Sequence, residues 1–156
     1  MSKAIYAGSF DPFTFGHLDI CKKASTLYDK LYIVIGVNTQ KKRMFDIQIM
    51  KTAIEKDLCD SNIDNFEVVV FDGLIAHLAE NLNAKYLVRG LRNNMDYNYE
   101  ENIAEINKLI NPSLNSIYFR ADNKAVSSSM VKELYSYGQD LSKYVPYNTL
   151  KAIMND

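Results

Sequence analysis

A segment near the start of the chain carries residue types that bind phosphate. Residues 8–17 read Gly-Ser-Phe-Asp-Pro-Phe-Thr-Phe-Gly-His, between a short apolar run and a stretch of helical period. The two glycines permit close approach of the backbone to a ligand. At the start of a helix, unpaired N–H groups and the positive dipole end favour an anion, and the Ser9 and Thr14 hydroxyls add donors. We therefore predict a phosphate site, with His17 as a neutral ring in the first turn that donates one hydrogen bond.

A structural explanation of the same residues is also open. Ser9, Asp11 and Thr14 are typical of residues that cap a turn, and His17 could be a solvated residue of a first helical turn. Spacing alone does not decide between the two interpretations.

Three further segments place phosphate-binding groups after predicted strands. Residues 41–43 are three consecutive cations, although such a run is usually a solvated face. Arg89 and Arg92 offer two guanidinium groups across a glycine, which suit a polyphosphate; ion-paired arginines in a surface turn are the alternative. Residues 127–129 are serines at a second helix start, where they could bind phosphate or simply cap the helix.

The first segment resembles the signature of the nucleotidyltransferases that share the H-x-G-H motif, with Thr14 where the first histidine often lies. The resemblance continues over essentially the whole chain, with four more motifs in the same order. These are K-K-R-M-F at 41–45, R-G-L-R at 89–92, D-Y-N-Y-E at 96–100 and S-S-S-M-V-K-E at 127–133. Together they resemble the bacterial phosphopantetheine adenylyltransferase family.

The resemblance implies transfer of the adenylyl group of ATP to 4′-phosphopantetheine, which gives dephospho-coenzyme A and pyrophosphate. It implies Mg²⁺ as the companion of ATP, no metal ligands from the chain itself, and a homohexamer. No cysteine, paired carboxylate or Ser-His-Asp set offers a covalent nucleophile, so direct in-line attack on the α-phosphorus is expected, with positioning and charge stabilisation as the main requirements.

Residue roles also follow from the resemblance. His17 and Lys41 are expected to be catalytic. The residues expected to bind the phosphopantetheine substrate are Ser9, Lys41, Ile75 and Arg89. Those expected to bind ATP are Ser9, Phe10, His17, Gly90, Leu91, Arg92, Glu100, Asn123, Lys124, Ala125, Val126, Ser127, Ser128 and Ser129.

Two other functions remain open at this point. A related nucleotidyltransferase with another small phosphorylated acceptor would share the first loop, and a nucleotide-binding module without turnover could share the whole fold. R-G-L-R and the serine-rich helix start favour the phosphopantetheine enzyme over the first alternative. Retention of His17, Lys41 and Arg92 argues against the second.

The elements that would position these groups alternate along the chain. Short β-branched or aromatic runs predict strands at 3–7, 31–37, 66–71, 86–88 and 116–119. Stretches of helical period predict helices at 17–27, 46–58, 74–82, 97–110, 128–137 and 147–153. We expect one α/β domain over residues 1–156: a Rossmann-like, doubly wound, parallel five-stranded sheet with helices on both faces.

Ligands of such sheets bind outside the carboxyl ends of the strands, near the switch in strand order. The segments described above all follow predicted strands, so we expect them to meet there. Asp46 is a predicted helix N-cap, and Gly138 is predicted to end a helix.

Composition narrows the functional class. The 156-residue chain has 18 Lys and Arg against 19 Asp and Glu, a net charge of −1, which argues against an extended nucleic-acid surface. The longest apolar run, residues 31–37, is far shorter than the roughly 20 residues that span a membrane. The N-terminal residues lack the pattern of a secretory signal. Cys21 and Cys59 lack metal-ligand spacing, so we expect buried thiols in a reduced, cytoplasmic protein.

Overall fold

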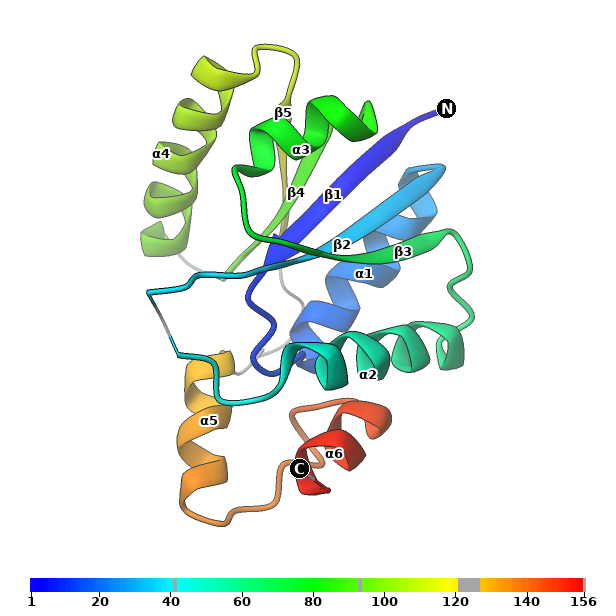
Figure 1. Ribbon diagram of the computed structural model, residues 1–156, viewed down its shortest axis with the longest axis vertical. Coiled ribbons are helices and arrows are strands. Elements are labelled where there is room, and N and C mark those ends of the chain that lie inside the picture. Colours follow the sequence, from blue (N-terminus) through cyan, green and yellow to red (C-terminus); the bar gives the residue numbers. More distant parts are fainter. Residues whose placement is uncertain (41, 93, 121–126, 156) are drawn as a thin grey trace.

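A computed structural model describes residues 1–40, 42–92, 94–120 and 127–155, which form an α/β fold around one parallel sheet (Figure 1). The strands are β1 (Lys3–Gly8), β2 (Lys30–Gly36), β3 (Phe66–Phe71), β4 (Tyr86–Leu91) and β5 (Asn115–Arg120). Their order is β3-β2-β1-β4-β5, and each neighbouring pair is parallel. The predicted doubly wound, Rossmann-like sheet is confirmed.

Helices cover both faces of this sheet (Figure 1). They are α1 (Phe15–Leu27), α2 (Ile47–Asp60), α3 (Ile75–Leu82), α4 (Asn94–Ile110), α5 (Ser128–Ser136) and α6 (Tyr147–Met154). Side chains alternate along β1, so Ala4 and Tyr6 join a core with α1 and α2, whereas Ile5 and Ala7 join a second core with α3. This alternation explains why the central strands are apolar on both sides.

Two predicted helix boundaries are confirmed by their caps. The Asp46 carboxylate accepts hydrogen bonds from the N–H groups of Gln48 and Ile49, both at 3.0 Å, at the start of α2. Gly138 follows α5 with φ of +70°, a conformation that glycine adopts without a Cβ penalty.

Other boundaries differ from the sequence prediction. β4 continues through Leu91 instead of ending at Val88, because residues 89–91 pair with the end of β5. Arg89 and Gly90 therefore lie on a strand and not in a loop. α1 begins at Phe15, with Thr14 as its N-cap, so His17 is its third residue.

The thiols also differ from expectation. Cys21 is buried and free, but Cys59 is free and exposed. The buried stripe of α2 includes Asp57 and Leu58 in its last turn, and Cys59 lies off that stripe.

α6 is capped by a side chain of another helix. Pro146 stands at its N-cap, and its side chain makes no capping hydrogen bond. Instead, the buried carboxylate of Asp57 in α2 accepts from the Asn148 N–H at 2.9 Å, and from the Thr149 N–H at 3.2 Å and hydroxyl at 2.6 Å.

In the described part of the chain, no helix is long and apolar enough to cross a membrane.

Candidate active site

A cavity of about 300 Å³ opens at the carboxyl ends of β1 and β4, where the strand order switches. Its walls come from the end of β1, the loop that follows, the start of α1, the end of β4, one residue of α4 and the start of α5. Parallel strands bring their carboxyl ends to one edge of a sheet, so the segments at 8–17, 89–92 and 127–129 meet here, as predicted. The segment at 41–43 was expected here too, but Lys42 and Arg43 lie outside the cavity lining.

The ring of His17 is oriented by the backbone of the helix N-cap. The Thr14 N–H donates to His17 Nδ1 at 3.0 Å, and the Thr14 hydroxyl accepts from the His17 N–H at 3.3 Å. Because Nδ1 accepts a hydrogen bond, the neutral ring carries its proton on Nε2. Nε2 is then a hydrogen-bond donor.

The pocket keeps His17 neutral. Burial, followed by the positive charges of Arg92 and Arg89, lowers the pKa of His17 to about 4. The rings of Phe10 and Phe13 lie 4.9 and 5.7 Å from it, centroid to centroid. The sequence predicted a neutral ring from the helix dipole, but burial and the two arginines are the main causes in the structure.

Arg89 and Glu100 form a bidentate ion pair on the pocket wall. Arg89 Nε lies 2.6 Å from Glu100 Oε2, and its NH2 lies 2.8 Å from Oε1. Arg89 NH1 also donates to the Ala7 carbonyl at 3.2 Å. From the family resemblance, Arg89 was expected to bind the acceptor and Glu100 to bind ATP, and no sequence feature predicted that they pair. In the structure the Glu100 carboxylate holds the Arg89 guanidinium in place.

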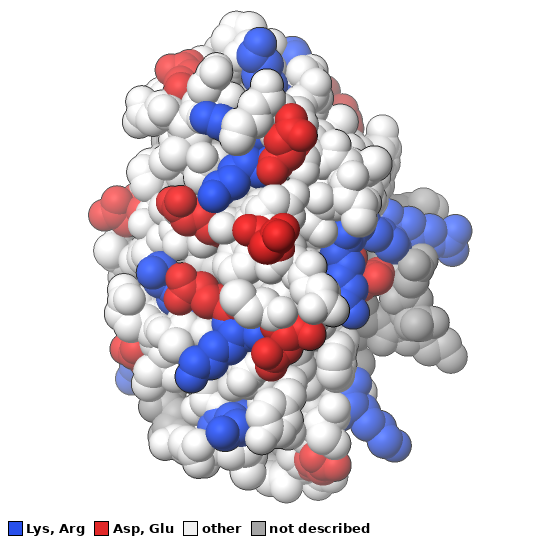
Figure 2. Space-filling view, turned by 90° about the vertical axis from the view of Figure 1, so that its right-hand side faces the viewer, with Lys and Arg blue, Asp and Glu red and all other residues white. Residues whose placement is uncertain are grey.

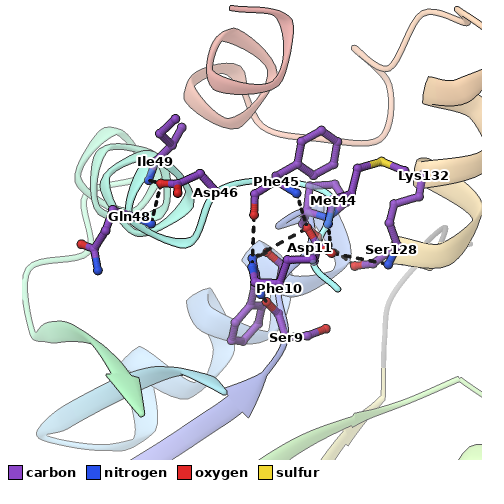
Figure 3. Close-up of polar contacts among 12 residues, drawn as sticks. Ser9, Phe10, Asp11, Met44, Phe45, Asp46, Gln48, Ile49, Ser128 and Lys132 are labelled. Atoms are coloured by element: carbon purple, nitrogen blue, oxygen red, sulfur yellow. Dashed lines mark hydrogen bonds and ion pairs between the residues drawn. The ribbon is translucent and has the colours of Figure 1, made fainter. Parts of the chain in front are cut away.

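A second set of contacts joins the loops around the pocket. Asp11, Arg43 and Lys132 form this set, which the sequence analysis missed. Figure 3 labels Asp11 and Lys132. Arg43 was expected to belong to a cationic run facing solvent or phosphate, but it donates to the carbonyls of Ser9 and Phe10. The Asp11 of the first motif, flanked by buried aromatic residues, was the available signal.

The structure brings together most of the predicted site residues that it describes. Those that line the cavity are Ser9, Phe10, His17, Arg89, Gly90, Arg92, Glu100, Ser127 and Ser128. The described residues outside its lining are Ile75, Leu91 and Ser129. Lys41, Asn123, Lys124, Ala125 and Val126 lie outside the described residues.

Three details refine these placements. Ile75 is half-buried at the start of α3 and packs against the second core. The hydroxyl of Ser127 caps α5, and that of Ser128 donates to the Pro12 carbonyl at 2.8 Å. The Thr14 hydroxyl, expected to add a donor for a ligand, lines the cavity and accepts the helix-capping bond from the His17 N–H.

The described residues contain no group of three or more His, Cys, Asp or Glu side chains that could hold a metal ion. A Mg²⁺ ion that entered with ATP would take most of its coordination from nucleotide oxygens and water. The donor set of the pocket, with arginine, hydroxyl and imidazole groups, suits phosphate oxygens rather than a bare cation.

The comparisons with known proteins agree with the geometry. Residues 5–134 match the cytidylyltransferase-like family. The chain is 42% identical to the phosphopantetheine adenylyltransferase of Cytophaga hutchinsonii, over 94% of this chain and 99% of that protein. It is 41% identical to the protein of the same name from Lactobacillus acidophilus, over 98% of this chain and 96% of that protein.

A solved structure supports the fold. The bifunctional NMN adenylyltransferase/ADP ribose pyrophosphatase of Francisella tularensis superposes with a TM-score of 0.77 at 20% identity, over 99% of this chain and 49% of that chain. Because the sequence matches to phosphopantetheine adenylyltransferases extend over nearly the full length of this chain, the chain belongs to the phosphopantetheine adenylyltransferase family.

Proposed function

We propose that residues 1–156 act as one nucleotidyltransferase domain that transfers the adenylyl group of ATP to 4′-phosphopantetheine. The products are dephospho-coenzyme A and pyrophosphate. One observation carries the proposal: a neutral His17, with Nε2 as donor, shares a cavity with Arg89, Arg92 and the N-terminus of α5. Such a cavity offers hydrogen-bond donors to successive phosphate groups of a polyphosphate.

The reaction is a direct displacement at phosphorus. An oxygen of the acceptor phosphate attacks the α-phosphorus of ATP, and the bond from that phosphorus to the bridging oxygen of pyrophosphate breaks. The attacking phosphate has a second pKa of roughly 6, so it is mostly dianionic at neutral pH and needs no general base. Catalysis then consists of alignment and stabilisation of charge on the phosphorus oxygens.

Each side chain has a role in this scheme. His17 donates from Nε2 to an oxygen of the pentacovalent phosphorus, together with Lys41, and Ser9 orients the attacking phosphate. Arg92 holds the departing pyrophosphate with the serines at 127–129.

The remaining contacts complete the two binding sites. Arg89, held by Glu100, and Ile75 serve the acceptor. The further ATP contacts are Phe10, Gly90, Leu91, Glu100 and residues 123–126. Mg²⁺, when bound with ATP, would neutralise part of the phosphate charge and would be held by phosphate oxygens and water.

A pyrophosphate-release assay tests the activity. The chain is given ATP and, in separate reactions, 4′-phosphopantetheine, pantetheine without its phosphate, and other small phosphorylated acceptors. Among these acceptors, we expect only 4′-phosphopantetheine to cause pyrophosphate release, with a product that has the mass of dephospho-coenzyme A. Release with a different acceptor would indicate a related nucleotidyltransferase, and ATP binding without release would indicate a module without turnover.

We also propose that the enzyme is a cytoplasmic homohexamer. The family resemblance supports the assembly, and the two free thiols fit a reducing compartment. Light scattering coupled to size-exclusion chromatography should give six times the mass of the 17.9 kDa chain. A monomer or dimer at micromolar concentration would contradict the assembly without affecting the assignment of activity.

A further inference from the structure

Asp11, in the loop after β1, is a buried carboxylate that contacts two other parts of the chain (Figure 3). Its oxygens accept from the backbone N–H groups of Met44 and Phe45, both at 2.9 Å. Two cations also face it: Arg43 NH2 lies 3.8 Å from Oδ1, and Lys132 Nζ lies 3.5 Å from Oδ2. The carboxylate therefore links the loop after β1, the segment before α2, and α5.

Arg43 strengthens the link between the first two of these segments. Its guanidinium donates to the carbonyls of Ser9 and Phe10, and its Nε donates to the Phe45 carbonyl at 3.1 Å. Ser9 and Phe10 line the cavity. The backbone that forms this side of the pocket is thus fixed from behind by a side chain that does not line the pocket.

α5 is attached to the same loop at two points, one helical turn apart. The Ser128 hydroxyl donates to the Pro12 carbonyl at 2.8 Å, and Lys132 pairs with Asp11. Residues four apart lie on one face of a helix, so both contacts restrain the same face. Ser127 and Ser128, at the start of this helix, line the cavity.

The Asp11 carboxylate does not depend on Lys132 alone for its hydrogen bonds. The Lys132 side chain is 33% exposed, so water screens its charge, and Asp11 already accepts two peptide hydrogen bonds without it. The pair between Lys132 and Asp11 fixes the orientation of α5 relative to the loop after β1, because Lys132 holds the second turn of the helix while Ser128 holds the first.

We infer that Lys132 is a positioning residue which, through Asp11, holds the start of α5 at the place where the pyrophosphate end of ATP binds. This inference rests on the proposed function, since the pyrophosphate site at residues 127–129 is part of that proposal. It assigns Lys132 an effect on ATP and pyrophosphate, with no effect on the acceptor.

Lys132→Met tests the inference, because methionine keeps the length of the side chain and removes its charge. We expect the KM for ATP, and the KM for pyrophosphate in the reverse reaction, to rise about tenfold, with the acceptor KM unchanged. Lys132→Arg should restore most of the loss. An ATP KM in Lys132→Met equal to that of the wild type would overturn the inference.

Lys51→Met is the matched control. Lys51 is 34% exposed and pairs with Glu55 at 3.7 Å on α2, so it matches Lys132 in its own exposure and ion-pair distance, but its partner is not buried. Neither residue lines the cavity. The control should leave every kinetic constant within about twofold of the wild type, because surface ion pairs of this kind contribute little. An equal rise in ATP KM in both variants would show a nonspecific effect and reject the inference.

A double-mutant cycle separates action through Asp11 from direct contact with ATP. In an Asp11→Asn background, Lys132→Met should raise the ATP KM by less than about twofold, since the partner is already lost. A further rise of about tenfold would mean that Lys132 acts on the nucleotide itself, and the inference would be wrong.

Hydrogen exchange gives the answer if Asp11→Asn does not fold. The Val131 N–H donates to the Ser127 carbonyl at 3.0 Å in the first turn of α5. This amide should exchange faster in Lys132→Met than in Lys51→Met. Equal exchange rates would refute the positioning role.

Calorimetry of ATP binding alone separates failure of this inference from failure of the proposed function. If the wild type forms no dephospho-coenzyme A while Lys132→Met still weakens ATP binding about tenfold, the proposed function fails and the positioning role stands. If the wild type turns over and Lys132→Met binds ATP as Lys51→Met does, only the positioning role fails.

Discussion

At the scale of single residues, His17 combines a fixed tautomer with a neutral charge. The Thr14 N–H fixes the proton on Nε2, and the lowered pKa keeps the ring neutral at pH 7. If this donor acts on the transition state more than on bound ATP, His17→Ala should lower kcat by roughly 10² to 10³ and change ATP affinity little. Steady-state kinetics with separate ATP titrations would measure both. A tenfold weaker binding of ATP with kcat intact would contradict this role.

The same pKa links His17 to the pH dependence of stability. In the unfolded chain its pKa is about 6.5, against about 4 in the fold, so between these values the unfolded state binds more protons. The free energy of unfolding should therefore rise with pH across this window, by up to about 3 kcal/mol from His17, and should lose that contribution as pH falls from 6.5 to 4.

Urea unfolding of His17→Ala at several pH values would measure this contribution by difference from the wild type. His77→Ala is the matched control, because His77 is the second of the two histidines and lies exposed on α3, outside the cavity lining. The pH dependence should flatten in His17→Ala and not in His77→Ala. Parallel curves for His17→Ala and wild type would show that the ring titrates normally in the fold.

At the scale of elements, α6 depends on α2 for its cap. Asp57 supplies a buried carboxylate to the two N–H groups at the start of α6, whereas Asp46 caps its own helix from an exposed position. We expect Asp57→Ala to lower the free energy of unfolding by about 3 kcal/mol, because it leaves buried donors unpaired. Asp46→Ala should cost about 1 kcal/mol, the usual effect of removing an N-cap.

Chemical denaturation of both variants would compare the two caps. The ratio matters more than either value, since both changes remove a carboxylate that accepts backbone N–H bonds. Equal losses would mean that burial adds nothing to the cap of α6.

Sequence periodicity identified the elements but not all of their ends. Apolar runs and helical period depend on local residue types, so the order of strands and helices was predictable. The end of β4 depends on a partner strand distant in sequence: Arg89, Gly90 and Leu91 are strand residues because β5 pairs with them. No local sequence pattern in this segment identifies β5 as its partner strand.

At the scale of the whole molecule, the topology of the sheet predicted where the cavity lies. The side-chain pairs that the sequence did not predict join separate segments of the chain. His17, Arg89, Arg92 and Ser127 line one cavity because parallel strands end at one edge. The pairing of Arg89 with Glu100 depends on distances across β4 and α4, which residue types do not reveal.

Charge over the whole molecule agrees with small ligands. On the face in Figure 2, acidic and basic side chains are interspersed, in keeping with the net charge of −1. Attraction of anions must then come from a local cluster of donors such as Arg89 and Arg92, which line the cavity.

The titratable groups of the described cavity also predict the pH profile of the reaction. His17 is neutral, Glu100 is paired with Arg89, and burial raises the pKa of Tyr6. With the pKa of His17 lowered to about 4 and that of Tyr6 raised, neither of these two groups is poised to act as a base near pH 6, so the acidic limb of kcat/KM for phosphopantetheine should reflect ionisation of the acceptor phosphate.

This limb should persist, at a much lower plateau, in His17→Ala when ATP is saturating. A pH series of initial rates on both proteins would test it. Disappearance of the limb in the variant alone would identify His17 as a titrating base and reject the mechanism.

The sheet order has a consequence for synthesis on the ribosome. β1, β2 and β3, which lie side by side, are all translated by residue 71, before β4 begins at residue 86. Chains grow from the N-terminus, and folding during synthesis proceeds in that direction. A nascent chain therefore holds His17 and three of the five strands before β4 and α5 add their side of the cavity. Premature termination in that interval would yield a fragment with one side of the cavity and an uncovered β1 edge, a substrate for chaperones and proteases.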